Sequence, residues 1–404
     1  MIKENAKSMK TPKFSVLLPT HNRLELLSRA ITTVQQQDYA DWEVIVSDNY
    51  SKEPIEAYIN SLNDERIKYV RTDAFIPVTE NWHNALKHSR GDYVIMLGDD
   101  DGLLKGYFSH LSQLIELYDA PDFLYTGALL YAYPGVIPGC DDGFLKSYIN
   151  RGIYQGRKDE FLLGPKKAQQ LVLDSLSFKV EFDYNMQFSL VSRKLINKLA
   201  IYGDFYQSPY PDYYASNVIM WCAERILVVP RPLVTVGISP KSFGYYYFNN
   251  AEQQGNKFLN NAPSKELAQR LSEVVMPGPV MNTSWLMSME MLALNLNKPE
   301  LKPNYTRYRF LQICAVFADL IIRKPEAEQA YQQLKPLMSN EEWLEYGVPF
   351  LQKSEETPEL QRKSVANKVR QLPASHPAVA MPSISGQFTT ILDVFEQVNT
   401  ASDQ

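Results

Sequence analysis

The chain has 404 residues, of which 45% are hydrophobic and 22% are charged. This is the composition of a globular protein, long enough for two domains with a sizeable core in at least one of them. The formal net charge of −5 offers no basic surface, which argues against nucleic acid as a partner.

The sequence contains no signal for export or membrane insertion. Residues 1–13 are polar and lack the apolar centre of a signal peptide. The longest apolar stretch, 311–322, is interrupted by polar residues and is too short to span a bilayer. Three widely spaced cysteines show no metal or redox spacing and predict no disulfide framework. We therefore predict a cytoplasmic protein, and peripheral contact with the inner face of the membrane stays open.

Strand and helix signals alternate in the first hundred residues. Apolar runs that end at turn-forming or acidic residues predict strands over 14–19, 42–48, 67–70 and 93–97. Apolar residues at helical spacing between these runs predict helices over 24–37, 54–62 and 80–89. This alternation predicts an α/β fold of the Rossmann-like type, with a mostly parallel sheet and helices on both faces.

The pattern becomes less regular after residue 120. Further strands are predicted over 122–126, 187–191, 226–230 and 233–236. Helices are predicted over 168–177, from 193 onward and over 212–223. The segment 134–164 is rich in glycine, proline, aspartate and tyrosine and predicts a long irregular loop, which in compact domains is often functional.

The last part of the chain shows almost only helical patterns. Helices are predicted over 264–275, 282–295, 308–323, 326–338, 340–346 and 389–398, and the proline-containing stretch 372–386 predicts a linker. We therefore divide the chain into an α/β domain, 1–240, and a mainly helical C-terminal module, 241–404. The module is expected to cover part of the acceptor side of the site or to mediate self-association.

Three successive carboxylates, Asp99, Asp100 and Asp101, follow the predicted strand 93–97. Carboxylates at such close range repel one another, so the run favours a bound cation. Ligands of open α/β sheets bind outside the carboxyl ends of the strands, and an all-oxygen cluster there suits Mg²⁺ or Mn²⁺. The alternative is a solvated acidic turn with no role.

Four segments in order resemble the family 2 glycosyltransferases, which have the GT-A fold. They are SVLLPTHNR (15–23), VIVSDNYS (44–51), GDYVIMLGDDD (91–101), and PDYY (211–214) with the later VVPRPLV (228–234). The third contains the acidic DxD-type motif of the family, and the fourth is similar to its late acidic residue, helix and proline-containing strand. The resemblance covers residues 1–240.

The resemblance implies roles for individual residues at the strand ends. Asp100 is expected to bind Mn²⁺ or Mg²⁺ directly, and Asp101 is expected to act on the metal through water or by holding its ligands in place. Gly98 stands where the family often has aspartate. The residues expected to bind the donor nucleotide are Pro19, Thr20, Asn22, Arg23, Asp48 and Asp99.

Two of these assignments have a structural alternative. Asp48 begins the run Asp-Asn-Tyr-Ser, which is also good turn chemistry. Arg23, expected to reach a phosphate, could equally be an exposed arginine at a helix start.

Asp212 matches the position where the family has its catalytic base, the group that takes the proton from the acceptor hydroxyl. Pro211 stands where the family commonly has glutamate, and Asp204 and Asp183 are local competitors for the role. The alternative for Asp212 is a helix N-cap.

The resemblance thus implies a metal-dependent, inverting glycosyltransferase that moves a hexose-type sugar from a nucleotide donor to a hydroxyl acceptor in surface or secreted polysaccharide biosynthesis. UDP-sugars are the favoured donors, with GDP- and dTDP-sugars as alternatives, and the acceptor is a glycan or a lipid-linked molecule. A homo-oligomer stays open.

Two other classes were weighed. A nucleotidyltransferase of similar fold would carry a glycine-rich phosphate loop with a basic residue after its first strand, which 19–23 does not resemble. A non-catalytic interaction protein with the same fold would be expected to lose its acidic positions, whereas Asp48, Asp100 and Asp212 are present.

Overall fold

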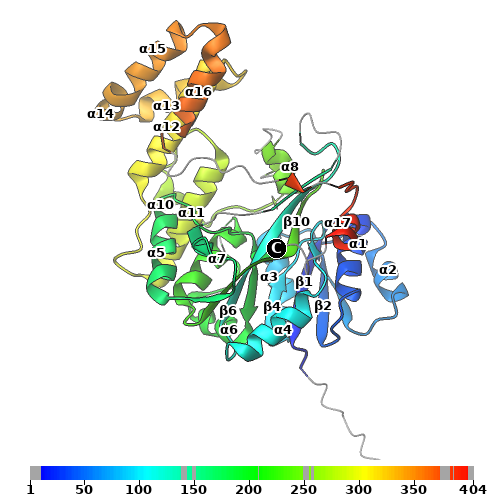
Figure 1. The fold of residues 1–404 in the computed structure, drawn as a ribbon. Coiled ribbons are helices and arrows are strands. Elements are labelled where there is room, and N and C mark those ends of the chain that lie inside the picture. The colour runs from blue at the N-terminus through cyan, green and yellow to red at the C-terminus, as the bar shows by residue number, and fades with distance from the viewer. Residues whose placement is uncertain are drawn as a thin grey trace, which may run out of the picture.

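The computed structural model describes residues 11–137, 143–147, 152–207, 209–248, 254–255, 259–373, 383–384 and 386–398. A twisted sheet with flanking helices forms one body, and a group of helices projects from it (Figure 1). Eleven strands join in this sheet, whose main path has the order β11-β7-β6-β9-β4-β1-β2-β3.

The N-terminal half of the sheet is parallel. It contains β1 (Phe14–Thr20), β2 (Trp42–Asp48), β3 (Ile67–Arg71) and β4 (Tyr93–Met96). The connecting helices are α1 (Leu24–Gln35), α2 (Ile55–Ser61) and α3 (Val78–His88). All residues of β1 and β2 are buried, as apolar runs in a parallel sheet covered on both faces should be. The predicted alternation is confirmed here.

The strand order places a switch point between β1 and β4. From β1 the chain steps outward to β2 and β3, and then returns across the sheet to β4 on the other side of β1. Because parallel crossovers are right-handed, α3 lies on the opposite face of the sheet from α1 and α2. The loops that leave β1 and β4 at their carboxyl ends lie side by side here, since Thr20 and Arg23 contact Asp99. Open α/β sheets bind ligands at such a switch point.

The other half of the sheet makes the whole sheet mixed. β9 (Ser189–Ser192) pairs antiparallel with β4 and with β6 (Phe123–Ala132). β10 (Ile226–Ile238) runs parallel to β6. The remaining strands pair antiparallel with these or with each other, and they are β5 (Gly102–Leu103), β7 (Phe144–Ser147), β8 (Phe161–Leu163) and β11 (Ser383–Ile384). The predicted class, α/β with helices around a central sheet and a helical C-terminal region, is confirmed.

Several boundaries differ from the prediction. The two strands predicted over 226–230 and 233–236 are one strand, β10, because a bulge between Val229 and Val234 accommodates the two prolines without breaking the pairing with β6. The predicted irregular segment 134–164 contains β7 and β8, and the strand predicted over 122–126 continues to Ala132. Most of the predicted linker, 372–386, lies outside the described residues.

Further helices flank the sheet. They are α4 (Tyr107–Leu117), which the sequence analysis did not predict, α5 (Pro165–Leu176), α6 (Arg193–Leu199) and α7 (Pro211–Cys222). Short 3₁₀ turns cover Gly152–Tyr154, Met186–Phe188 and Ala200–Tyr202.

The C-terminal part is mainly helical, as predicted. Its helices are α8 (Phe243–Phe248), α10 (Lys265–Leu271), α11 (Val280–Leu296), α12 (Tyr305–Ile321), α13 (Ala327–Leu334), α14 (Asn340–Glu342), α15 (Val348–Glu356), α16 (Arg362–Gln371) and α17 (Ile391–Gln397). A π-helical turn, Trp343–Gly347, joins α14 to α15, and 3₁₀ turns cover Lys335–Leu337 and Glu359–Gln361. Helices α12 to α16 form the projecting group in Figure 1, and a second core joins them to residues of α10 and α11.

The sheet core also takes in residues from late in the chain. Trp285 and Met289 of α11, and Ile391 and Val394 of α17, belong to the same buried cluster as β1. In Figure 1 the red helix α17 lies beside the blue helix α1. The domain boundary near residue 240 stays a prediction. Across the described ranges, we find no helix with both the length and the apolar character needed to cross a membrane.

Candidate active site

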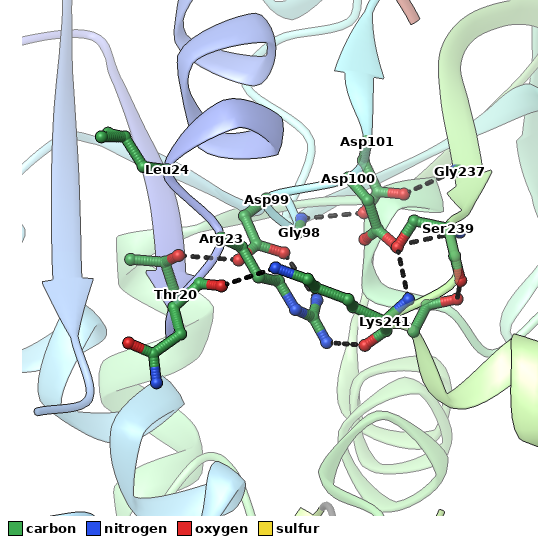
Figure 2. Close-up of polar contacts among 12 residues, drawn as sticks. Thr20, Arg23, Leu24, Gly98, Asp99, Asp100, Asp101, Gly237, Ser239 and Lys241 are labelled. Atoms are coloured by element: carbon green, nitrogen blue, oxygen red, sulfur yellow. Dashed lines mark hydrogen bonds and ion pairs between the residues drawn. The ribbon is translucent and has the colours of Figure 1, made fainter. Parts of the chain in front are cut away.

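The acidic run lies at the switch point, opposite the end of β1. Asp99 accepts a hydrogen bond from the Thr20 hydroxyl at 2.7 Å. It also forms an ion pair with Arg23, with 2.8 Å between Nη1 and Oδ1 (Figure 2). Burial opposes the charge of the guanidinium, but Asp99 and Asp100 outweigh this effect and raise the pKa of Arg23. The turn after β1 thus places the positively charged Arg23 side chain beside the carboxylates that follow β4.

Asp101 is held by the backbone on both sides of it. Its Oδ1 accepts a hydrogen bond from the Gly237 amide at 2.7 Å, and its Oδ2 accepts one from the Gly98 amide at 2.8 Å. The Gln187 amide donates a third hydrogen bond to Oδ2. Burial and the neighbouring Asp100 raise the pKa of Asp101 to about 8. Through these contacts, Asp101 holds the acidic run against β10.

Asp100 faces the segment that follows β10. Its Oδ2 accepts a hydrogen bond from the Ser239 hydroxyl at 2.8 Å, and the Ser239 amide lies 3.4 Å away (Figure 2). Burial raises the pKa of Asp100, and Asp99 adds to this effect. Burial thus favours the protonated form of the Asp100 carboxyl group, whereas a bound cation would favour its ionised form.

The donor set fits a hard divalent cation of the kind predicted. No group of three or more histidine, cysteine, aspartate or glutamate side chains converges as metal ligands in the described part of the chain. Mg²⁺ is usually bound through only one or two carboxylates, with phosphate and water oxygens completing its shell. The free carboxylate capacity of Asp100, at the wall of the cavity, satisfies that requirement.

Asp212 is the second residue of α7 and not its N-cap. Tyr210 occupies the N-cap position, and Asp212 Oδ1 accepts a hydrogen bond from the next backbone amide at 3.0 Å. Burial raises the pKa of Asp212 to about 7, against an ordinary value of 3.8. Asp212 therefore does not occupy the N-cap position, although its carboxylate accepts a hydrogen bond from an amide of the first turn. Its raised pKa is suited to a general base near neutral pH.

The two competitors of Asp212 lie elsewhere. The side chain of Asp204 is 70% exposed and lies 3.5 Å from His83. Asp183 is buried but does not line the cavity that contains Asp212.

One cavity of about 440 Å³ joins most of the predicted site. Pro19, Thr20 and Arg23 line it from the end of β1, and the whole acidic run and Asp212 line it from other sides. Two predicted residues, Asn22 and Asp48, do not line it.

Asp48 and Asn22 are instead used in the turns after β1 and β2. Asp48 is fully buried, and its carboxylate accepts hydrogen bonds from the Ser51 amide at 2.9 Å and the Tyr69 hydroxyl at 2.7 Å. Asn22 joins the two turns. Its backbone amide donates a hydrogen bond to the Ser51 hydroxyl, and its side-chain oxygen accepts one from the Lys52 backbone amide. Both residues shape the cavity edge without reaching into it.

Two further residues that the sequence analysis did not select contact the site from the segment after β10, although neither of them lines the cavity. Ser239 and Lys241 follow β10, and Lys241 is tied to the first turn: its ammonium lies 3.0 Å from the Asn22 carbonyl, and its own carbonyl accepts from Arg23. The signal that could have identified Ser239 is its place at a strand end. His21 and Phe75, with ring centroids 4.7 Å apart, form another wall beside Thr20.

The topology and the cavity define an α/β protein with a candidate ligand site at its switch point. Residues 15–137, from β1 to just beyond β6, match the model of the family described as glycosyl transferase family 2. This part of the chain therefore belongs to glycosyl transferase family 2, and the recognition made from the sequence is confirmed. The matched segment includes the acidic run and ends before Asp212.

Curated relatives carry related names. The chain is 41% identical over 105 residues to the GalNAc(5)-diNAcBac-PP-undecaprenol beta-1,3-glucosyltransferase of Campylobacter jejuni, covering 25% of this chain and 34% of the relative. It is 34% identical over 136 residues to the putative colanic acid biosynthesis glycosyl transferase WcaA of Escherichia coli, covering 31% and 48%. The alignments thus span between about a third and a half of these relatives.

Among solved structures, Staphylococcus aureus TarS 1–349 in complex with UDP-GlcNAc aligns with a TM-score of 0.43 and 13% identity. The alignment covers 82% of this chain and 92% of that one. The architecture described above is established by the strand order and does not depend on this likeness.

Proposed function

We propose that the protein is an inverting, metal-dependent glycosyltransferase that moves a sugar from a nucleotide-sugar donor to a hydroxyl group of a glycan or lipid-linked acceptor. One observation carries this proposal: the acidic run and Asp212, which lie more than a hundred residues apart in the sequence, line the same cavity at the switch point of the sheet. Membership of residues 15–137 in glycosyl transferase family 2 supports the reaction class.

The donor is placed along the β1 side of the cavity. The rings of His21 and Phe75 offer an apolar surface for a nucleobase, and Thr20 and Asp99 offer hydrogen-bonding groups for a ribose. Arg23 is the fixed cation nearest the acidic run and is suited to a phosphate oxygen. The proposed donor is a UDP-sugar, with GDP- and dTDP-sugars as alternatives.

The predicted Mg²⁺ or Mn²⁺ would be held by Asp100, while Asp101 keeps its three hydrogen bonds and holds the loop. When bound, the ion supplies Lewis-acid stabilisation of the negative charge on the departing diphosphate. The residues of this chain have two further tasks at that point. Arg23 neutralises part of the same charge, and Asp101 with Ser239 fixes the position of Asp100.

Asp212 is proposed to take the proton from the acceptor hydroxyl. As the hydroxyl oxygen forms its bond to the anomeric carbon, the carbon–oxygen bond to the diphosphate breaks on the opposite face, and the electron pair leaves with the phosphate. The proton passes to the Asp212 carboxylate, so no covalent intermediate with the protein is required. A pKa of about 7 leaves a substantial fraction of this carboxylate ionised at neutral pH.

The name of the Campylobacter relative points to lipid-linked acceptors, since it includes a pyrophosphate-linked undecaprenol. Another relative, WfgD of Escherichia coli, is named for a diphosphoundecaprenol substrate and is 29% identical over 87 residues, 22% of this chain and 34% of the relative. These names support a membrane-borne acceptor in polysaccharide biosynthesis, which the protein would meet as a peripheral protein.

A donor screen tests the proposal. The full chain is incubated with Mn²⁺ and a panel of UDP-, GDP- and dTDP-sugars, and release of free nucleotide is measured with and without an added mixture of glycan acceptors. We expect release from one nucleotide class, lost in the Asp212→Asn variant. Release of pyrophosphate from a nucleoside triphosphate and a sugar phosphate would instead make the protein a nucleotidyltransferase, and the absence of any turnover and of nucleotide binding would contradict an enzymatic role.

A further inference from the structure

The half of the cavity that contains Asp212 is walled by aromatic rings. Tyr184 precedes β9, and Phe243 begins α8. Tyr210 is the N-cap of α7, and Tyr213 lies in its first turn. We call these four residues the aromatic wall. None of them belongs to the matched family segment 15–137, and none takes part in the acidic run.

The rings of the aromatic wall are held against one another. Tyr210 stacks on Tyr213 with centroids 5.2 Å apart, and Tyr184 meets Tyr213 edge-on at 4.4 Å. Phe243 meets Tyr210 edge-on at 5.6 Å. Behind them, Trp285 of α11 contacts both Tyr184 and Tyr213, at 5.4 and 5.0 Å. A binding surface built this way loses little conformational entropy when a ligand arrives.

All four members of the wall line the cavity, and two of them are also partly exposed. Tyr210 and Tyr213 are buried, whereas Tyr184 and Phe243 are only partly buried. Asp212 lies between Tyr210 and Tyr213 in the sequence, so the proposed base and the rings are carried by the same turn of α7. The proposed base and the wall therefore line the same part of the cavity.

We propose that the aromatic wall is the acceptor subsite, and that it binds a pyranose ring at the end of the acceptor. This proposal rests on the proposed function and adds the chemical class of the group that receives the sugar. The axial C–H groups of a pyranose form an apolar face that packs on an aromatic ring, while its equatorial hydroxyls point outward at the rim. One of those hydroxyls then lies where Asp212 removes its proton.

The polar groups around the wall favour a sugar over an isoprenoid chain. Asn185 lines the cavity next to Tyr184, and the hydroxyl of Tyr184 is hydrogen-bonded to that of Tyr213. An isoprenoid chain would cover these groups without offering a hydrogen bond, at a free-energy cost, whereas a pyranose supplies hydroxyl partners. The lipid part of a lipid-linked acceptor is therefore placed outside the wall.

Saturation-transfer NMR on the full chain tests this subsite directly. The probes are the methyl β-glycosides of glucose, galactose and N-acetylglucosamine, with farnesyl phosphate as the isoprenoid probe, all in the presence of UDP and Mg²⁺. We expect saturation of the axial ring protons of at least one glycoside. The signal should fall at least fivefold in Phe243→Ala and in Tyr184→Ala, and stay unchanged in Tyr118→Ala, whose partly buried tyrosine lies at the end of α4, away from the cavity.

Calorimetric binding of UDP to each variant shows whether the donor side stays intact, and Tyr184→Phe should retain the glycoside signal because the ring is kept. Glycoside signals that survive both alanine variants, or that are absent while farnesyl phosphate is saturated, would overturn the subsite. In either case turnover in the donor screen would still support the proposed function. Conversely, if the glycosides bind but no nucleotide-sugar is turned over, the aromatic wall would still be a saccharide-binding site and the proposed reaction would be contradicted.

Discussion

Arg23 and Asp99 form a buried ion pair at the centre of the candidate site, with side chains 10% and 3% exposed. The pair joins the turn after β1 to the loop after β4, across the switch point. A buried charge that loses its partner is far more costly than one that keeps it. The pair therefore sets the charge of the site and also holds its two sides together.

We predict that Arg23→Gln lowers the free energy of unfolding by about 3–5 kcal/mol, because Asp99 is left buried without its cation. The same change should weaken UDP binding. Adding Asp99→Asn to Arg23→Gln should restore most of the stability but not the nucleotide affinity. Urea unfolding and calorimetry on the two single variants and the double variant measure both effects, and a double variant as unstable as Arg23→Gln would show that the pair is not the cause.

Asp100 should be the residue that makes nucleotide binding depend on metal. With Asp100→Asn we expect UDP to bind equally weakly in Mg²⁺ and in chelator, whereas the unmodified protein binds more tightly in Mg²⁺. Asp92→Asn is the matched control, because Asp92 is an exposed aspartate just before β4. If calorimetry gave the unmodified protein the same affinity in Mg²⁺ and in chelator, Asp100 would have no metal to hold.

Asp212→Asn should lower kcat by roughly 10²–10⁴-fold, which is the usual contribution of a general base. Donor affinity should stay within about twofold, since the side chain touches no group assigned to the nucleotide. Asp204→Asn is the local control, because Asp204 is exposed and paired only with His83 in the described contacts. A normal kcat in the Asp212 variant, or a loss confined to the Asp204 variant, would move the base elsewhere.

The raised pKa of Asp212 predicts a pH profile. The base acts only when ionised, so log kcat/KM should rise with unit slope up to a pH of about 7 and then level off. The midpoint should disappear in Asp212→Asn, whose residual activity should not depend on pH in this range. A midpoint near pH 4 would mean that the carboxylate titrates as it does in water.

The same group should make the fold less stable as the pH rises. Because the folded-state pKa of Asp212 lies above its ordinary value of 3.8, the folded state binds the proton more tightly between pH 4 and 7. The stabilising contribution is thus complete below pH 4 and is lost as the pH rises through about 7. Asp212→Asn should have a higher Tm than the unmodified protein at pH 8 and an equal Tm at pH 4. Thermal unfolding at the two pH values checks the sign.

Gly98→Asp, which would recreate the residue that the family often has at this position, should harm this protein. A Cβ on Gly98 would lie 2.5 Å from Asp101 Oδ2, and three hydrogen bonds hold that carboxylate in place. Overpacking of this kind costs about 1–3 kcal/mol, and a further negative charge adds to it. Gly164→Asp is the control, since nothing lies near its Cβ position. Because Gly164 is the N-cap of α5, where aspartate is favoured, the control should leave the Tm equal or higher. A Tm unchanged by Gly98→Asp would show that the loop can rearrange.

The sequence was sufficient to place residues at strand ends in the parallel half of the sheet. Thr20 and the acidic run each follow a buried apolar strand, and parallel strands bring their carboxyl ends to one edge, so their meeting could be predicted. The sequence was not sufficient to predict whether a side chain at the end of a strand lines the cavity or bonds within the neighbouring turn. Asp48 also ends a strand, but Ser51 and Tyr69 supply its hydrogen bonds within the turn region.

Other parts of the site depend on contacts between distant segments. The aromatic wall unites rings from before β9, from α7 and from α8, and no short-range pattern relates Tyr184 to Phe243. β5 has only two residues and exists because β10 passes beside it. The two prolines of β10 led to the prediction of two separate strands. The bulge that accommodates them depends on the pairing with β6, which the local sequence does not indicate.

Helix α17 lies late in the chain but packs against the sheet that is formed by its first part. Ile391 packs on Gly102, directly after the acidic run, and Tyr131 donates a hydrogen bond to the Phe388 carbonyl. During synthesis on the ribosome, β1 to β4 emerge long before this helix, so the nascent sheet has an uncovered apolar surface while the projecting helices are being made. The packing around Gly102, directly after Asp99 to Asp101, is therefore completed only once the residues up to 391 have been synthesised.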